Sequence, residues 1–90
     1  MVSRTVLIAN KRGLHARASA KFVTLASQQP CEVRVEKDGA GEQVTGTSIM
    51  GLMMLGAAMG DRVVISADGD GAEDAVAAMA GLVEAKFGED

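Results

Sequence analysis

The sequence predicts an α+β fold of two layers, in which a four-stranded antiparallel sheet carries three helices on one face. Its 90 residues, of which 48% are hydrophobic, suit a single domain, residues 1–90, with one core. The hydrophobic periodicity changes along the chain in the order β-α-β-β-α-β-α. Each amphipathic helix needs one apolar surface to cover. One face of an antiparallel sheet provides that surface while the other faces water.

The elements follow from alternation in the strands and from apolar residues at helical spacing in the helices. Ala18, Phe22 and Ala26 belong to the stripe of the first helix, and Pro30 lies just beyond its end. In chain order we expect a strand at 3–8, a helix at 16–27, a strand at 31–36, its hairpin partner at 42–45, a short apolar helix at 48–55, a strand at 61–67 and a last helix of about 15 residues.

The last helix carries the clearest local signals. Asp70 is the expected N-cap, with Glu73 three residues later, and Lys86 and Gly88 are expected to close the helix. Its apolar stripe consists of Val76, Met79, Val83 and Phe87. We therefore expect this helix to run through Phe87 and to cover the core.

Composition argues against several functional classes. The chain lacks a run of about 18 apolar residues and a signal-peptide pattern, so we expect a cytoplasmic protein without membrane insertion. A single cysteine, Cys31, and a single histidine do not make a structural zinc site, and we expect neither metal nor cofactor. The sequence has no Trp, no Tyr and only two Phe, which argues against stacking on nucleic-acid bases.

Charge is distributed unevenly along the chain. Residues 1–31 contain five basic side chains and no acidic one, whereas residues 32–90 contain twelve acidic and four basic side chains. Arg17 would lie in the first turn of a helix, where the helix dipole opposes a cation. Surface charges can cluster by chance. An anionic ligand, or a partner with an acidic face, explains the arrangement better.

His15 is the candidate reactive residue, because it lies where a strand gives way to a helix, in Gly13-Leu14-His15-Ala16-Arg17-Ala18. The unpaired N–H groups at a helix N-terminus favour an anion and disfavour imidazolium. A neutral imidazole can attack phosphorus, and those N–H groups with Arg17 can then hold the phosphoryl charge. The simpler alternative is a histidine that only caps a helix or fills a turn.

Two segments, residues 10–18 (NKRGLHARA) and residues 47–56 (TSIMGLMMLG), resemble the histidine-containing phosphocarrier family, HPr, of the phosphotransferase system. The resemblance covers essentially the whole chain. It implies that His15 accepts a phosphoryl group on Nδ1 from enzyme I and passes it to enzyme IIA proteins, with Arg17 beside the phosphoryl group. Ala18 departs from the pattern, because many members have proline there, and we expect a slightly looser first turn.

The resemblance implies further sites. Ser48 is a helix cap by its position, and it matches the serine that an HPr kinase/phosphorylase modifies in some members of the family. A phosphate there would weaken docking of an acidic partner by like-charge repulsion. The docking face implied by the family consists of Ala16, Ala20, Lys21, Ile49, Met50 and Met53.

Three interpretations remain. The first is a monomeric phosphoryl carrier that is not an enzyme in its own right, because one nucleophile without a positioned base or a metal needs partners to complete each transfer site. The second is a regulatory binding module that acts through phosphorylated Ser48. The third is a globular domain whose histidine is only a cap. The sequence does not distinguish the sugar branch from the nitrogen branch, nor does it identify the enzyme IIA partners.

Overall fold

Four strands form one antiparallel sheet. The computed structural model describes residues 1–89. The strands are β1 (Val2–Leu7), β2 (Val33–Lys37), β3 (Gln43–Thr45) and β4 (Arg62–Ala67), and their order across the sheet is β1-β4-β2-β3. In this register Val63 of β4 lies opposite Val6 of β1, and Ile65 lies opposite Val35 of β2. The central strand β4 therefore presents apolar side chains that continue across the sheet.

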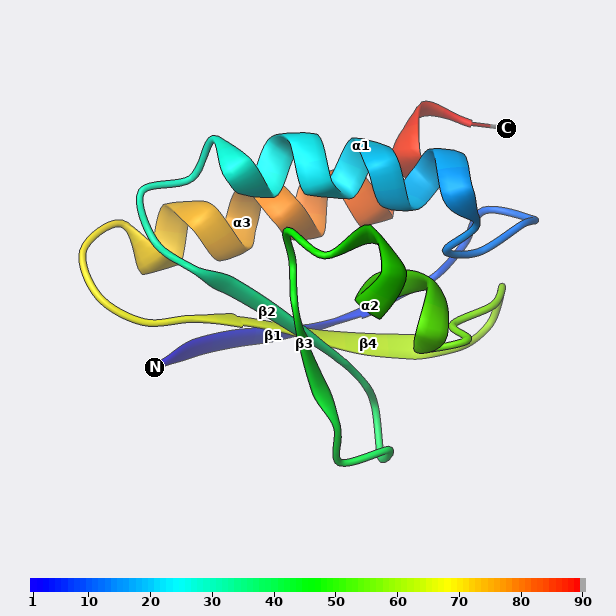
Figure 1. The fold of residues 1–90 in the computed structure, drawn as a ribbon, viewed down its shortest axis with the longest axis horizontal. Coiled ribbons are helices and arrows are strands. Elements are labelled where there is room, and N and C mark those ends of the chain that lie inside the picture. The colour runs from blue at the N-terminus through cyan, green and yellow to red at the C-terminus, as the bar shows by residue number, and fades with distance from the viewer. Residues whose placement is uncertain (90) are drawn as a thin grey trace.

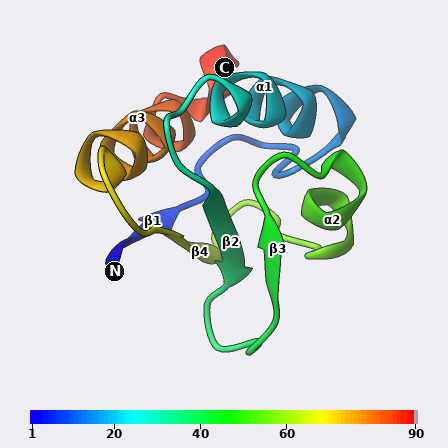
Figure 2. The ribbon, with the colours of Figure 1, turned by 60° about the vertical axis from the view of Figure 1, so that its left-hand side comes forward.

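Three helices lie on one side of this sheet, as Figures 1 and 2 show. They are α1 (Ala16–Ser27), α2 (Ile49–Met54) and α3 (Ala72–Glu84), and a short 3₁₀ turn, η1 (Lys86–Gly88), follows α3. The predicted α+β fold, its element order and its one-sided helical layer are confirmed. Within residues 1–89, no helix is both long and apolar enough to cross a membrane.

The core lies between the two layers. Its largest fully buried apolar side chains are Phe22, Phe87, Ile8, Leu52, Ile65, Met79, Val35, Val63 and Val83. Apolar side chains at helical spacing on α1 and α3 belong to one buried cluster with alternate residues of the strands, as the two periodicities predict. The opposite face of the sheet is open, and Leu7 on that face is 48% exposed.

Strand β2 begins later than the alternation predicts. Residues 31 and 32 lie outside the strand, and the first pair joins Val33 to Ala67, which is the last residue of β4. A strand needs hydrogen-bonding partners. Because β4 ends at Ala67, the alternating pattern at residues 31–36 extends beyond the partner strand.

Both ends of α3 differ from the prediction. The N-cap is Gly71, in a left-handed conformation (φ 82°), and its carbonyl accepts from the N–H of Ala75 at 2.9 Å, so Asp70 is not the cap. A Cβ at Gly71 would lie 2.6 Å from Pro30 Cγ, which favours glycine at this position. The helix ends at Glu84, and Phe87 reaches the core through a left-handed turn (φ 55°) instead.

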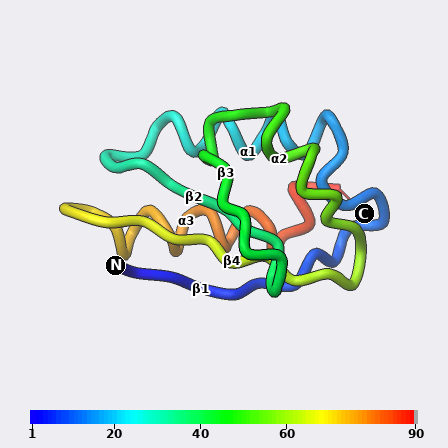
Figure 3. The backbone as a smooth tube through the Cα atoms, turned by 60° about the horizontal axis from the view of Figure 1, so that its bottom comes forward, coloured from blue at the N-terminus to red at the C-terminus, as the bar shows by residue number. Residues whose placement is uncertain are grey.

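This C-terminal turn brings the end of the chain back to the beginning of α1. Phe87 is 1% exposed and so anchors the turn in the core. The amino group of Lys21 in α1 donates to the carbonyl of Phe87 at 2.8 Å. Figure 3 shows the turn that follows α3, in red, close to the loop that precedes α1, in blue. Glu89 is thereby placed next to His15.

Candidate functional site

His15 directly precedes α1 and is its N-cap, with an extended backbone (φ −75°, ψ 179°). Its Nδ1 atom accepts from the N–H of Arg17 at 3.3 Å. The first N–H to donate within the helix is that of Ser19, which donates to the carbonyl of His15 at 2.9 Å. The N–H groups of residues 16–18 therefore precede the helical ladder, and that of Arg17 points at Nδ1.

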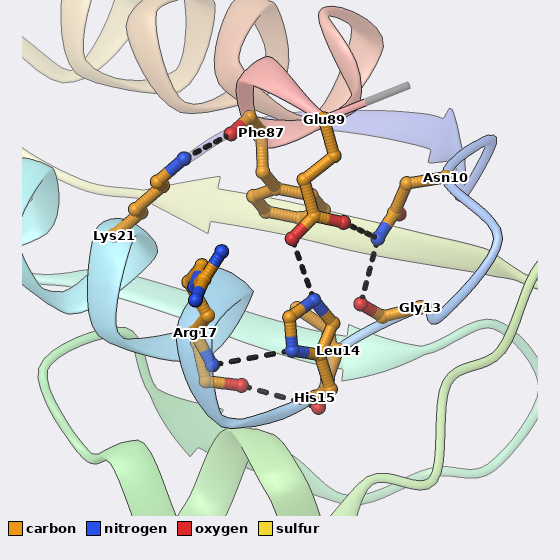
Figure 4. A network of polar contacts seen from close by, with 9 residues as sticks. Asn10, Gly13, Leu14, His15, Arg17, Lys21, Phe87 and Glu89 are labelled. Carbon is orange, nitrogen blue, oxygen red and sulfur yellow. Dashed lines mark hydrogen bonds and ion pairs between the residues drawn. The ribbon is translucent and has the colours of Figure 1, made fainter.

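The other ring nitrogen of His15 meets a carboxylate. His15 Nε2 lies 2.6 Å from Oε2 of Glu89, and the two side chains are 21% and 19% exposed. The second carboxylate oxygen, Oε1, accepts from Nδ2 of Asn10 at 3.0 Å, and the same amide nitrogen donates to the carbonyl of Gly13 at 2.9 Å. Figure 4 shows this continuous network. The imidazole is therefore held at both nitrogens.

The partners of the ring define its chemistry. A backbone N–H only donates, so the contact with Arg17 requires a lone pair on Nδ1. A proton on Nε2 then faces the carboxylate of Glu89. The nitrogen that carries the lone pair is thus the one beside the helix N-terminus. An anionic group bound to this nitrogen would be stabilised by the free N–H groups there.

Four basic side chains line a cavity to which Glu89 also contributes. The cavity, of about 400 Å³, is lined by Lys11, Arg12, Arg17, Lys21, Gly88 and Glu89. Four of the five basic residues in the first 31 positions therefore meet at one place, as the uneven charge distribution predicts. The hydrogen bond from Asn10 lowers the pKa of Glu89 below its ordinary value. Partial burial opposes this shift in pKa, while His15 and the charge of Lys21 support it.

Glu89 and Asn10 are the members of this site that sequence reasoning missed. Glu89 is separated from His15 by 74 positions and from Asn10 by 79 positions, and it lies in the acidic part of the chain. A local sequence pattern does not predict such a contact, because the contact depends on how the turn after α3 folds. The buried Oδ1 atom of Asn10 has no hydrogen-bond partner among residues 1–89. An unpaired buried oxygen costs about 1–3 kcal/mol, so another interaction must favour this amide orientation.

Ser48 caps α2, as its sequence position predicts. Its Oγ atom accepts from the N–H of Gly51 at 3.0 Å, and its side chain is half-buried. The local structure thus accounts for a serine at this position by capping alone. Capping also places the hydroxyl at the beginning of a helix, where a phosphate would meet favourable dipole ends.

The predicted docking residues are exposed and lie on two helices that pack against each other, α1 and α2. Exposed fractions are 38% for Ile49, 65% for Met50 and 43% for Met53. Ala16, Ala20 and Lys21 are exposed on α1. Met54, which is not among the predicted docking residues, is 80% exposed. Its exposure could be foreseen from the short length of α2, which buries only Leu52.

Metal ligands do not cluster here. Among residues 1–89, no group of three or more His, Cys, Asp or Glu side chains is arranged to hold a metal ion.

Comparison with known proteins identifies the family. Residues 2–85 match the family model for the PTS HPr component phosphorylation site. The phosphocarrier protein HPr of Neisseria meningitidis serogroup A is 46% identical over 89 residues, which cover 99% of this chain and 98% of the relative. The phosphocarrier protein NPr of Shewanella violacea is 38% identical over 88 residues, which cover 98% of this chain and 94% of that relative.

A solved structure agrees. The crystal structure of HPr-C-His from Thermoanaerobacter tengcongensis superposes with a TM-score of 0.91 at 47% identity, and the match covers 100% of this chain and 99% of that one. Sequence and fold therefore agree over nearly the full length. The chain belongs to the HPr family of phosphocarrier proteins of the phosphotransferase system.

Proposed function

We propose that His15 accepts a phosphoryl group on Nδ1 from phosphorylated enzyme I and passes it to enzyme IIA proteins. One observation supports this most directly. Nδ1 carries the lone pair of the ring at the N-terminus of α1, and Arg17 and Glu89, which both contact this ring, line a cavity together with three further basic side chains. A nucleophile and an anion-binding environment thus occur at one place.

The transfer requires no chemistry beyond that of the imidazole. The Nδ1 lone pair forms a bond to phosphorus, and the bond from phosphorus to the donor's leaving atom breaks, with its electron pair going to the donor. The added charge then lies beside the N–H groups of residues 16–18 and the guanidinium of Arg17. Helix-end stabilisation of about 1–2 kcal/mol holds the phosphoryl group without preventing onward transfer.

The test follows the phosphoryl group through both transfers. The protein is incubated with phosphoenolpyruvate and enzyme I, and its intact mass is measured before and after acid treatment. We expect one acid-labile phosphoryl addition, which disappears when an enzyme IIA protein is added. No addition, with an enzyme I that phosphorylates another HPr, would overturn the proposal, and an acid-stable addition would indicate a serine instead.

The nitrogen branch of the system is the second candidate pathway. The 38% identity to an NPr protein supports it, whereas higher identity to HPr proteins supports the sugar branch. The same phosphorylation assay distinguishes the two when enzyme I and enzyme IIA proteins of each branch are compared. The branch whose proteins transfer faster at equal concentrations is the one the chain serves.

We propose that phosphorylation of Ser48 by an HPr kinase/phosphorylase reduces this transfer. Ser48→Asp should slow phosphorylation of His15 by enzyme I about threefold to tenfold, because a negative charge beside the docking helices repels an acidic partner. Aspartate is as good an N-cap as serine, so the free energy of unfolding should hardly change. Ser48→Ala is the matched variant, and it should lose about 1 kcal/mol of stability while keeping its transfer rate. Equal rates in wild type and Ser48→Asp would contradict the regulatory role.

The exposed apolar side chains of α2 are proposed as the surface that enzyme I and enzyme IIA contact. Met53→Asp should weaken binding to both partners about tenfold or more, because it places a charge in an apolar contact. Titration calorimetry with each partner measures this. Leu7→Asp is the control, since Leu7 is 48% exposed on the opposite face of the sheet. Equal loss of affinity in both variants would exclude α2 as the specific docking surface.

The remaining expectations stay predictions. They are a single domain over residues 1–90, a monomer and a cytoplasmic location. Sedimentation velocity of the purified chain measures the oligomeric state directly.

A further inference from the structure

We propose that Glu89 and Asn10 are positioning residues, which keep the proton of His15 on Nε2 both before and after phosphorylation. The inference rests on the proposed function for its meaning in phosphoryl transfer. Its geometric part concerns the unphosphorylated chain and is tested separately. Neither side chain contacts the nitrogen that would be phosphorylated, and both act through the ring of His15.

The hydrogen-bond network runs between two backbone groups that cannot change their roles. At one end the N–H of Arg17 donates to Nδ1 of His15 at 3.3 Å. At the other end the carbonyl of Gly13 accepts from Nδ2 of Asn10 at 2.9 Å. Because an N–H always donates and a carbonyl always accepts, every group between them has a fixed role.

Glu89 is the group between these two ends. The ring must donate from Nε2, at 2.6 Å from Oε2, and the amide of Asn10 must donate to Oε1 at 3.0 Å. Each oxygen of Glu89 therefore faces a hydrogen-bond donor. Only a carboxylate offers an acceptor to both donors. An amide would present its own NH₂ group to one of them.

The unpaired buried Oδ1 atom of Asn10 supports this interpretation. Rotating the amide would turn Oδ1 toward the carbonyl of Gly13 and toward the carboxylate of Glu89, so that acceptors would meet acceptors. The observed orientation leaves one oxygen unpaired and keeps both donations. The unpaired Oδ1 atom is therefore unfavourable by itself, but this amide orientation fixes the direction of the hydrogen bonds to Gly13 and Glu89.

The C-terminal turn holds Glu89 firmly enough for this role. Phe87 is buried in the core, and its carbonyl accepts from Nζ of Lys21 at 2.8 Å. Lys11, Arg12, Arg17 and Lys21 line the same cavity as Glu89. The hydrogen bond from Asn10 lowers the pKa of Glu89 and so favours its ionised form, burial opposes this shift, and the contact with His15 and the charge of Lys21 support it.

The same proton matters for onward transfer. When Nδ1 bonds to phosphorus while Nε2 keeps its proton, the ring becomes a cation that faces the carboxylate of Glu89. In the next step the bond from Nδ1 to phosphorus breaks, its electron pair returns to Nδ1, and a neutral imidazole leaves. Loss of the Nε2 proton beforehand would make the leaving group an imidazolate, which leaves far more slowly. Glu89 therefore keeps the phosphoryl group transferable.

The test compares Glu89→Gln with wild type and with Glu84→Gln, which changes an exposed carboxylate at the end of α3. The ¹⁵N chemical shifts of the His15 ring are measured on the unphosphorylated proteins over a pH series and compared at its alkaline end, where a further rise in pH no longer changes them. Wild type and Glu84→Gln should show a protonated Nε2 and an unprotonated Nδ1. Glu89→Gln should show a mixture of both tautomers, because its oxygen accepts from a protonated Nε2 in one amide orientation and its NH₂ group requires a lone pair on Nε2 in the other. Identical ring shifts in all three proteins would overturn the positioning role.

The second readout is the pH profile of transfer from each phosphorylated protein to enzyme IIA. Glu89→Gln should transfer about tenfold more slowly than wild type at alkaline pH, and the difference should shrink as the pH is lowered, because solvent then supplies the proton. A purely structural defect would lower the rate by the same factor at every pH, and parallel profiles would overturn the proposal. Failure of wild type itself to become phosphorylated would overturn the carrier function instead, and the ¹⁵N measurement would still decide the role of Glu89.

Discussion

His15→Ala should abolish acid-labile phosphorylation by enzyme I, with a loss of more than about a thousandfold in rate. His15 is the only histidine in the chain, so no other imidazole can take its place. The substitution removes the Nδ1 lone pair that lies beside the helix N-terminus. Intact mass after incubation with phosphoenolpyruvate and enzyme I measures the effect.

The matched variant is His15→Asn, because His15 also caps α1 and alanine is a poor cap. Loss of the cap in His15→Ala should lower the free energy of unfolding by about 1 kcal/mol. Asparagine is among the preferred N-caps and should restore most of that stability while remaining unphosphorylated. An acid-labile phosphoryl group on either variant would show that the acceptor lies elsewhere in the chain.

Much of the fold could be predicted because its signals are local. Alternation and helical spacing identify the strands and helices in order, and the first helix matches its predicted limits, Ala16–Ser27. Errors occur where an element's end depends on a distant partner. Strand β2 begins only where β4 offers a partner, at Ala67. Phe87 fits the helical stripe and is buried, yet it lies beyond α3 in a left-handed turn.

The candidate site divides in the same way. The segment around His15 and Arg17, and the cap at Ser48, could be recognised from neighbouring residues in the sequence. The contact between His15 and Glu89 could not, because it depends on how the end of α3 is folded back across the molecule. A glutamate near the C-terminus also resembles any solvent-exposed acidic residue. Its role becomes visible only when the hydrogen bonds at both ends of the network are known.

The largest loss of stability is expected for Gly13→Ala, in the loop directly before His15. Gly13 has φ 62°, a left-handed conformation that costs other residues about 1–2 kcal/mol. A Cβ there would collide with the carbonyl oxygen of Ala57 and would lie 2.7 Å from Cα of Ala58. Both are backbone atoms, so a side-chain rotation cannot relieve the contact. We expect a loss of about 3–5 kcal/mol, measured by urea unfolding.

Gly39→Ala separates the two causes of this loss of stability, which are backbone strain and the steric contact. Gly39 has φ 85°, but a Cβ there would meet no atom within 4 Å, so Gly39→Ala should lose only about 1–2 kcal/mol of stability, the cost of the added backbone strain. The difference in stability between the two variants measures the cost of the contact with residues 57 and 58.

The same backbone segment also positions the residue before His15, because the N–H of Leu14 donates to the carbonyl of Ala57 at 3.0 Å. Folded Gly13→Ala should therefore accept phosphoryl groups more slowly than Gly39→Ala, because small displacements of a reacting atom reduce rates strongly. Equal stabilities and equal rates in the two variants would show that the loop, and with it His15, is positioned by other contacts.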